Sequence, residues 1–260
     1  MCLQLRRRLQ SITSKLPAFV ALLVILLIWQ AACSFEIVPA YMLPSPAKVV
    51  HALWNYRETL MLHAGYTLQE TFYGLGAGIL LSFVTATLMD RFDILDKAFA
   101  PLLVISQTIP TIAIAPILVL WFGYEMTPKI ILVVLTTYFP ITVGLLGGYK
   151  SVDRDSVDLM RSMGASRIEI FRHLKFPQAL PQFFSGLRIA ASYAVVGAVV
   201  AEWLGGFNGL GVCMTRMRKA YAFDTMFGII LFIVFISLLL LLGVKILSRV
   251  CMPWLRSDSE

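Results

Sequence analysis

Charge is scarce in this chain. Only 14% of its 260 residues are Asp, Glu, Lys or Arg, whereas 58% are hydrophobic. A soluble domain of this length cannot bury so much apolar surface, so the composition excludes an ordinary soluble fold and predicts an all-α polytopic membrane protein. The net charge of +7 is therefore interpreted as membrane topology and attraction to anionic membrane lipids, and no nucleic-acid binding is predicted.

The motifs of common enzyme chemistry are also missing. No GxxxxGK[ST] phosphate loop occurs, so the chain is not expected to bind ATP by that route. The histidines His51, His63 and His173 are far apart and no HExxH occurs, which argues against a metalloenzyme or a membrane protease. The four cysteines lack metal-ligand spacing. The sequence thus predicts no catalytic residue and no metal site in this chain.

Apolar runs long enough to cross a bilayer are frequent. A hydrocarbon core about 30 Å thick needs roughly 20 helical residues per crossing. Five charge-free runs have about that length, and a sixth, Gln182–Gly205, contains Arg188 and Glu202 near its ends. We therefore predict about six spans in one transmembrane domain, residues 16–250, between an N-terminal segment 1–15 and a tail 251–260. The charge-free runs are Leu16–Phe35, Thr71–Met89, Ala98–Tyr124, Ile130–Tyr149 and Thr225–Val244.

The placement of Lys and Arg predicts the orientation. With the N-terminus in the cytoplasm, most basic residues fall on the cytoplasmic side, so both termini are predicted to be cytoplasmic. A cleaved N-terminus is an alternative, because three arginines precede the first apolar run and "QAAC" at residues 30–33 resembles a lipoprotein cleavage site. We expect an uncleaved first helix, since that run is long enough to span and Gln30 is a poor residue three places before the cysteine.

Glycine and proline shape the expected spans. Gly74 and Gly78 form a GxxxG pair, which lets helices approach closely in lipid; a nucleotide loop is disfavoured because no strand precedes it. Pro110 and Pro116 predict a kinked or broken third span, and "YFP" at residues 138–140 predicts another interruption. Such breaks fit a translocation path, but they also occur in purely structural membrane helices.

A polar, basic segment separates the fourth and fifth spans, within a predicted cytoplasmic loop 150–181. Gly164 can adopt the backbone angles that end a helix sharply. Ser166 can cap the next helix, and Glu169 three residues later completes a capping box. The pattern predicts two short helices at an angle, presented to the cytoplasm.

The second of these helices is expected to have an anchored apolar face formed by Ile168, Phe171 and Leu174. Pro177 and Pro181 are expected to break the chain again before the fifth span. The projecting tip would then be free to dock against a partner.

This segment resembles the EAA motif of the transmembrane subunits of ATP-binding cassette importers. Gly164, Ala165 and Ser166 match the family's GAS, whereas the bulkier Leu159 and Met160 replace its two alanines. In that family the segment is the coupling helix, which inserts into a groove of the ATPase subunit. The residues to which the resemblance assigns ATPase coupling are Asp158, Leu159, Met160, Arg161, Gly164, Ala165, Ser166, Phe171 and Pro177.

Other stretches extend the resemblance over residues 40–250. "LPSP" (43–46), "GLRIA" (186–190) and "GLG" (209–211) are similar to the branch that serves sulfonates, nitrate, taurine and thiamine-precursor pyrimidines. The stretch 201–224, "AEWLGGFNGLGVCMTRMRKAYAFD", is most similar to the permeases associated with pyrimidine thiamine precursors. The resemblance therefore implies import of such a pyrimidine, with a sulfonate, taurine or nitrate as the alternative.

The resemblance also implies the architecture and the partners. It implies the type I importer permease fold in a prokaryotic cell membrane, with two copies of this chain forming the pore. Two ATPase subunits would bind ATP and Mg²⁺, and an extracellular or lipid-anchored binding protein would deliver the solute. This chain would then be a transport subunit, with no cofactor of its own and no enzymatic activity.

Four residues near the expected kinks are candidates for lining the substrate path: Gln107, Thr108, Tyr138 and Glu202. The alternative is that they form interhelical hydrogen bonds. Only Arg188 and Glu202 are ionisable within the expected spans, so an ion-driven secondary carrier is less favoured than a transporter powered from outside the chain. A secondary carrier, the scaffold of a vitamin-uptake system and a membrane enzyme remain more distant alternatives.

Overall fold

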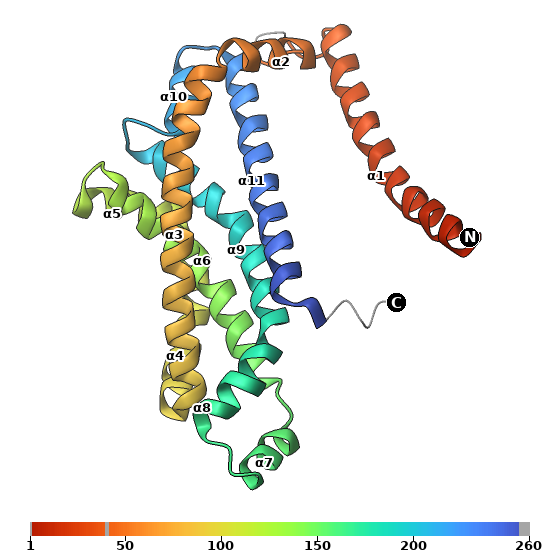
Figure 1. Cartoon of the computed structure of the whole chain (residues 1–260). Helices are drawn as coiled ribbons and strands as arrows, with labels where there is room; N and C mark the ends of the chain where they lie inside the picture. The colour runs from red at the N-terminus through yellow and green to blue at the C-terminus, as the bar shows by residue number, and fades with distance from the viewer. Residues whose placement is uncertain (1, 40–41, 255–260) are drawn as a thin grey trace. The chain divides into compact units, whose positions relative to one another are not determined.

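The computed structural model describes residues 2–39 and 42–254, which form helices and connecting turns without a β-strand (Figure 1). The chain divides into two compact units. One contains the residues up to Leu60 together with Met214–Leu231, and the other contains Met61–Cys213 together with the residues from Phe232 onward. The predicted all-α fold is confirmed for the described residues.

Four helical runs in the described residues are long and apolar enough to cross a membrane. Helices α4 (Asp93–Thr108) and α5 (Thr111–Phe122) add a fifth crossing only if they are taken together, because they meet at 96°. The apolar helical stretch Phe19–Ser34 is shorter than these runs. The predicted number of six spans is therefore not confirmed. The four runs are α3 (Arg57–Arg91), α6 (Met126–Lys150), Arg167–Leu204 and α11 (Phe223–Cys251).

The first unit contains α1 (Cys2–Ser34) and α2 (Pro46–Asn55). The Trp29 indole N–H donates a hydrogen bond to the Pro44 carbonyl (3.1 Å), which ties α1 to the turn that precedes α2. Residues 2–15, predicted as a separate segment, continue directly into the first apolar run within α1. In the predicted tail 251–260, α11 ends at Cys251, and residues 255–260 lie outside the described residues.

The core of the second unit lies where α6 packs on α9 (Phe176–Leu204). Small residues allow this close approach: a Cβ atom at Gly148 would lie 2.6 Å from Ala179 Cα, and one at Gly186 would collide with the Pro140 carbonyl. In a membrane, helices associate through such close van der Waals packing because burial from water provides no driving force between them. The contact between α6 and α9 is therefore a tightly packed part of this unit.

The predicted GxxxG pair packs as expected. A Cβ atom at Gly74 would lie 2.5 Å from the Val133 side chain, and one at Gly78 would collide with the Thr137 hydroxyl. The two glycines thus bring α3 close to α6, which confirms helix packing as the role of "YGLGAG".

Two helix interruptions are expected at prolines in the third and fourth spans, and the structure shows one of them. The break at Pro110 is confirmed, since α4 ends at Thr108 and α5 begins at Thr111. The interruption predicted at "YFP" is wrong, because α6 passes through Pro140 unbroken. The hydroxyls of Ser82 and Thr142 donate hydrogen bonds to the carbonyl of Tyr138, two residues before the proline (2.9 and 2.7 Å). Pro140 removes the N–H that would bond the Thr136 carbonyl, and membrane helices tolerate such a loss where neighbouring helices and side chains pack around it.

The break predicted at Pro177 and Pro181 is also wrong. Helix α8 (Arg167–Ile170), a π-helical turn η1 (Phe171–Lys175) and α9 form one continuous run of 38 residues. Pro177 lies in the first turn of α9 and Pro181 lies inside it. The π turn directly before Pro177 shifts the hydrogen-bond register and absorbs the irregularity. The second of the two predicted short helices is therefore the first turn of a membrane helix.

Candidate functional site

The candidate coupling segment begins at Asp153 and ends at Phe171. Its first helix, α7 (Arg154–Ser162), is capped by the Asp153 carboxylate, which accepts a hydrogen bond from the Ser156 N–H (3.2 Å). Gly164 ends the helix with a φ of +85°, and the Ala165 N–H donates back to the Met160 carbonyl (3.0 Å). A left-handed residue with this back bond is a common helix termination, and the prediction for Gly164 is confirmed.

The next helix starts with the predicted capping box. The Ser166 hydroxyl accepts a hydrogen bond from the Glu169 N–H (3.3 Å), and the Glu169 carboxylate accepts one from the Ser166 N–H (2.7 Å). Backbone groups at both helix ends of this turn therefore find hydrogen-bond partners within the segment itself. Figure 1 shows α7 projecting beyond the end of α8 at this turn.

Exposed apolar side chains lie along the segment. Leu159, Met163 and Ile168 are 63%, 79% and 78% exposed, respectively. The prediction that Ile168 belongs to the anchored face is wrong, because Ile170 is the buried residue instead. Phe171 is anchored as predicted, with its ring centroid 5.3 Å from that of Tyr149. Exposed apolar groups beside charged ones are typical of a protein docking surface.

The remaining predicted coupling residues fall into two groups. Asp158 and Arg161 are exposed and form an ion pair at 3.0 Å on α7. The other three, Met160, Ala165 and Pro177, are half-buried. The structure therefore places four of the nine predicted residues on α7, three in the turn after it, Phe171 at the start of the π turn and Pro177 in the first turn of α9.

A cavity of about 550 Å³ lies on the second unit, where α6 and α9 meet the end of α4. Gln107 lines it, and a neighbouring cavity of about 240 Å³ is lined by Gln107 and Tyr138. Thr108 and Glu202 line neither of these cavities. Thr108 donates a hydrogen bond to the Ile105 carbonyl of its own helix (2.8 Å). The structure thus brings together two of the four residues predicted for the substrate path.

The polar lining of the larger cavity includes residues that the sequence interpretation missed. Gln182, Ser185 and Tyr193 on α9 all line it. Their spacing places them near one face of a 3.6-residue helix, and they lie within an otherwise apolar run. A search for polar residues at helical period inside the spans would have identified them.

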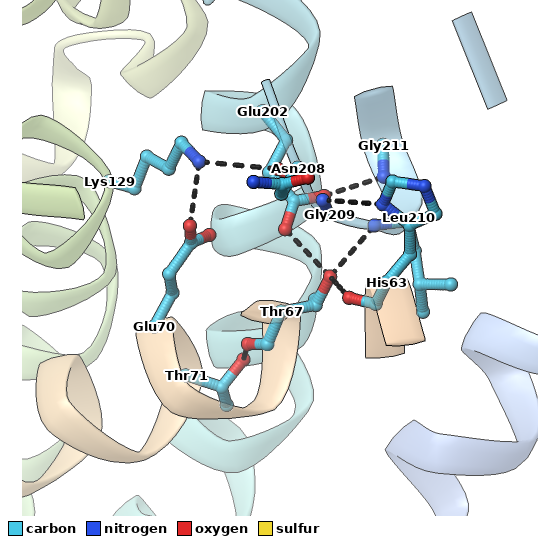
Figure 2. A network of polar contacts seen from close by, with 10 residues as sticks. All are labelled: His63, Thr67, Glu70, Thr71, Lys129, Glu202, Asn208, Gly209, Leu210 and Gly211. Carbon is cyan, nitrogen blue, oxygen red and sulfur yellow. Dashed lines mark hydrogen bonds and ion pairs between the residues drawn. The ribbon is translucent and has the colours of Figure 1, made fainter. Parts of the chain in front are cut away.

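Glu202 belongs instead to a buried network, which Figure 2 shows. It is only 2% exposed. One carboxylate oxygen accepts a hydrogen bond from the Thr67 hydroxyl (2.6 Å), and the other accepts one from the Gly211 N–H (2.5 Å). These are the interhelical hydrogen bonds of the alternative interpretation.

The network holds the glycine-rich turn 205–211 where α10 (Leu210–Lys219) begins. The Gly209 N–H donates to His63 Nδ1 (3.0 Å), and the Leu210 N–H donates to the Thr67 hydroxyl (2.9 Å). Together with the Gly211 N–H, three consecutive backbone donors at a helix start are satisfied by side chains from α3 and α9. A buried helix end needs such partners, so the network fixes this turn.

An ion pair completes the network. Lys129 on α6 contacts Glu70 on α3 at 2.7 Å, and their side chains are only 6% and 2% exposed. The expectation that only Arg188 and Glu202 are ionisable within the spans is therefore wrong. Helices α3 and α6 begin several residues before the charge-free runs, and each charge lies in that extra length. A buried charge needs a partner, and each of these two provides it for the other.

Most of the chain is similar to a known protein family. Residues 78–257 match the family model described as "binding-protein-dependent transport system inner membrane component". A probable ABC transporter permease protein of Haemophilus influenzae is 41% identical over 217 residues, covering 84% of this chain and 89% of that protein. The formylaminopyrimidine transport permease protein ThiX of Halalkalibacterium halodurans is 39% identical over 233 residues, covering 89% and 93%.

A solved structure has the same fold. The inward-facing MetNI methionine ABC transporter contains a chain that superposes with a TM-score of 0.61 at 17% identity, covering 76% of this chain and 97% of that one. This likeness confirms the importer permease fold and carries no information on the solute. On the family match and the two relatives, the chain belongs to the binding-protein-dependent transport system inner membrane components and is the permease subunit of an ABC importer.

Proposed function

We propose that this permease imports a formylaminopyrimidine-type thiamine precursor, and that segment 153–171 couples its movement to a partner ATPase. The observation that carries the coupling proposal is the capped tip formed by α7, Gly164 and Ser166. The observation that supports the solute is the 39% identity to a formylaminopyrimidine permease over 93% of that protein's length.

The tip is suited to transmit motion because of its connections. Helix α7 ends at Ser162 and the chain turns at Gly164, so a partner can hold α7 as a separate small body. The helix that starts at Ser166 continues without interruption to Leu204, so a displacement of the tip acts directly on the helix that lines the cavity. Rigid-body movement of this kind is a common way to exchange two conformations.

The cavity offers groups that suit an aminopyrimidine. The amides of Gln107 and Gln182 and the hydroxyl of Ser185 provide hydrogen-bond donors and acceptors, and Tyr193 and Phe139 provide aromatic surface. An aminopyrimidine is a flat ring with both donors and acceptors at its edge. Tyr193 is 56% exposed, so this face is incomplete in one chain, and a second copy would close it.

The assembly that follows from the proposal has two copies of this chain, because one chain supplies one coupling segment. Two ATPase subunits bind ATP and Mg²⁺ on the cytoplasmic side, where both termini of this chain also lie. A binding protein delivers the solute from the other side. The chain itself then needs no cofactor.

The test is uptake into liposomes that contain this chain with the ATPase and the binding protein of the same transport system. Labelled formylaminopyrimidine and taurine are offered with ATP and without it. ATP-dependent uptake of the pyrimidine alone supports the proposal. ATP-dependent uptake of taurine would refute the solute and keep the coupling, whereas uptake driven by an ion gradient without ATP would refute the coupling as well.

A further inference from the structure

A π-helical turn lies between the coupling segment and the membrane helix α9. The Phe176 N–H donates to the carbonyl of Phe171, five residues earlier, so residues 171–175 contain one residue more than an α-helical turn. In an α-helix each residue is rotated by about 100° about the helix axis relative to the one before it. The inserted residue therefore sets the direction in which α8 leaves α9, and π turns of this kind are frequent at functional sites.

The last residue of that turn is tied to a different helix. Lys175 Nζ lies 2.8 Å from both carboxylate oxygens of Asp90, near the end of α3. The two side chains are only 24% and 14% exposed, so the ion pair is largely shielded from water. A shielded, charge-assisted pair holds its geometry more firmly than a surface pair does.

The opposite end of the turn is anchored by aromatic rings. Phe171 packs against Tyr149 on α6 at 5.3 Å between centroids, and against Phe176 at 6.3 Å. The π turn is thus held by an aromatic contact to α6 and by an ion pair to α3. Of these two attachments, the ion pair depends on the relative position of two charged groups, and a single substitution can abolish it.

We propose that Lys175 and Asp90 are a positioning pair, which fixes the direction of the coupling segment by holding the π turn against α3. The pair touches neither the solute nor ATP, and it acts through Phe171–Lys175. Without it, the tip still docks on its partner, but its displacement is absorbed at the π turn and reaches α9 only in part. This inference rests on the proposed coupling function of segment 153–171.

The test measures solute imported per ATP hydrolysed, in liposomes with the complete complex. Lys175→Met and Asp90→Asn are each expected to lower that ratio by about fivefold, the low end of couplings between distant sites, while ATP hydrolysis continues. The exchanged pair Asp90→Lys with Lys175→Asp is expected to recover most of it. Lys150→Met is the matched control, because Lys150, the last residue of α6, pairs with Asp96 on α4 at 2.6 Å but is 51% exposed.

The outcomes distinguish failure of the positioning pair from failure of the coupling function on which it rests. An unchanged ratio in Lys175→Met and Asp90→Asn overturns the positioning pair, provided that the unaltered complex couples transport to ATP. An equal loss in Lys150→Met overturns it too, since any ion pair in that region would then matter. If the unaltered complex imports solute without ATP, the coupling function itself is refuted. Lys175→Arg, which keeps the charge, is expected to retain the ratio, and Asp90→Asn carries the test if Lys175→Met fails to assemble.

Discussion

Replacing Gly186 by alanine tests the packing that holds the cavity together. A Cβ atom at this position would collide with the Pro140 carbonyl oxygen and lie 3.0 Å from the carbonyl carbon and 3.4 Å from Ile141 Cα. These are backbone atoms, so no side chain can rotate away, and α9 must move off α6. Gly76 on α3 provides the matched control, because nothing lies within 4 Å of a Cβ atom there.

The expected magnitude follows from two opposing terms. Overpacking a tight contact costs about 2 to 3 kcal/mol. Exchanging glycine for alanine inside a helix returns about 1 kcal/mol, so Gly186→Ala should destabilise the protein by about 1 to 2 kcal/mol. For a chain of this size each kcal/mol shifts Tm by about 2 to 4 °C. Gly186→Ala is therefore expected to lower Tm by about 2 to 8 °C, and Gly76→Ala to raise it by about 2 to 4 °C.

The assay is thermal unfolding of the purified chain in one mild detergent, followed by tryptophan fluorescence for all three proteins. Equal Tm values for Gly186→Ala and Gly76→Ala would refute the argument, since they would show that α6 and α9 are not in backbone contact. A rise in both would mean that helix propensity alone decides the outcome.

Substitutions at three further positions test the candidate sites. Gly164→Val places a β-branched residue at a φ of +85°, so ATP hydrolysis should continue while uptake into liposomes falls; normal uptake would contradict the role of the turn. Ser166→Ala removes the cap of α8, so it should lower stability by about 1 kcal/mol in the thermal unfolding assay and lower uptake less than Gly164→Val does; an equal loss of uptake in the two variants would argue against this order. Glu202→Leu removes the carboxylate that accepts from the Gly211 N–H and the Thr67 hydroxyl, so it should cost about 1 to 3 kcal/mol, whereas Glu202→Gln, measured by the same unfolding assay, should cost less; the reverse order would contradict the network.

Features set by neighbouring residues in the sequence could be predicted. The sharp turn at Gly164 and the capping box of Ser166 and Glu169 depend on backbone angles and on groups three residues apart, so the sequence contains all that they need. The GxxxG pair was predictable for the same reason, because it depends only on the absence of side chains on one helix face.

Features set by distant partners could not be predicted in this way. Pro140 lies inside α6, and its carbonyl is approached closely by Gly186 of α9, a contact that forms only in the folded chain. Lys129 and Glu70 are 59 residues apart in the chain and pair only once α3 and α6 are packed. Glu202 was found from its charge, but its place in a network rather than in the cavity depends on the fold of turn 205–211.

The central claim is that the tip formed by α7 and the following turn docks on a partner ATPase. The most direct measurement places a photo-crosslinking amino acid at Met163, which is 79% exposed, and irradiates the complex in its native membrane. Tyr221, which is 81% exposed in the turn after α10, carries the same group as the control. A crosslink to an ATPase subunit from position 163 and none from position 221 is the predicted result. A crosslink to that subunit from position 221, with none from position 163, would contradict the account.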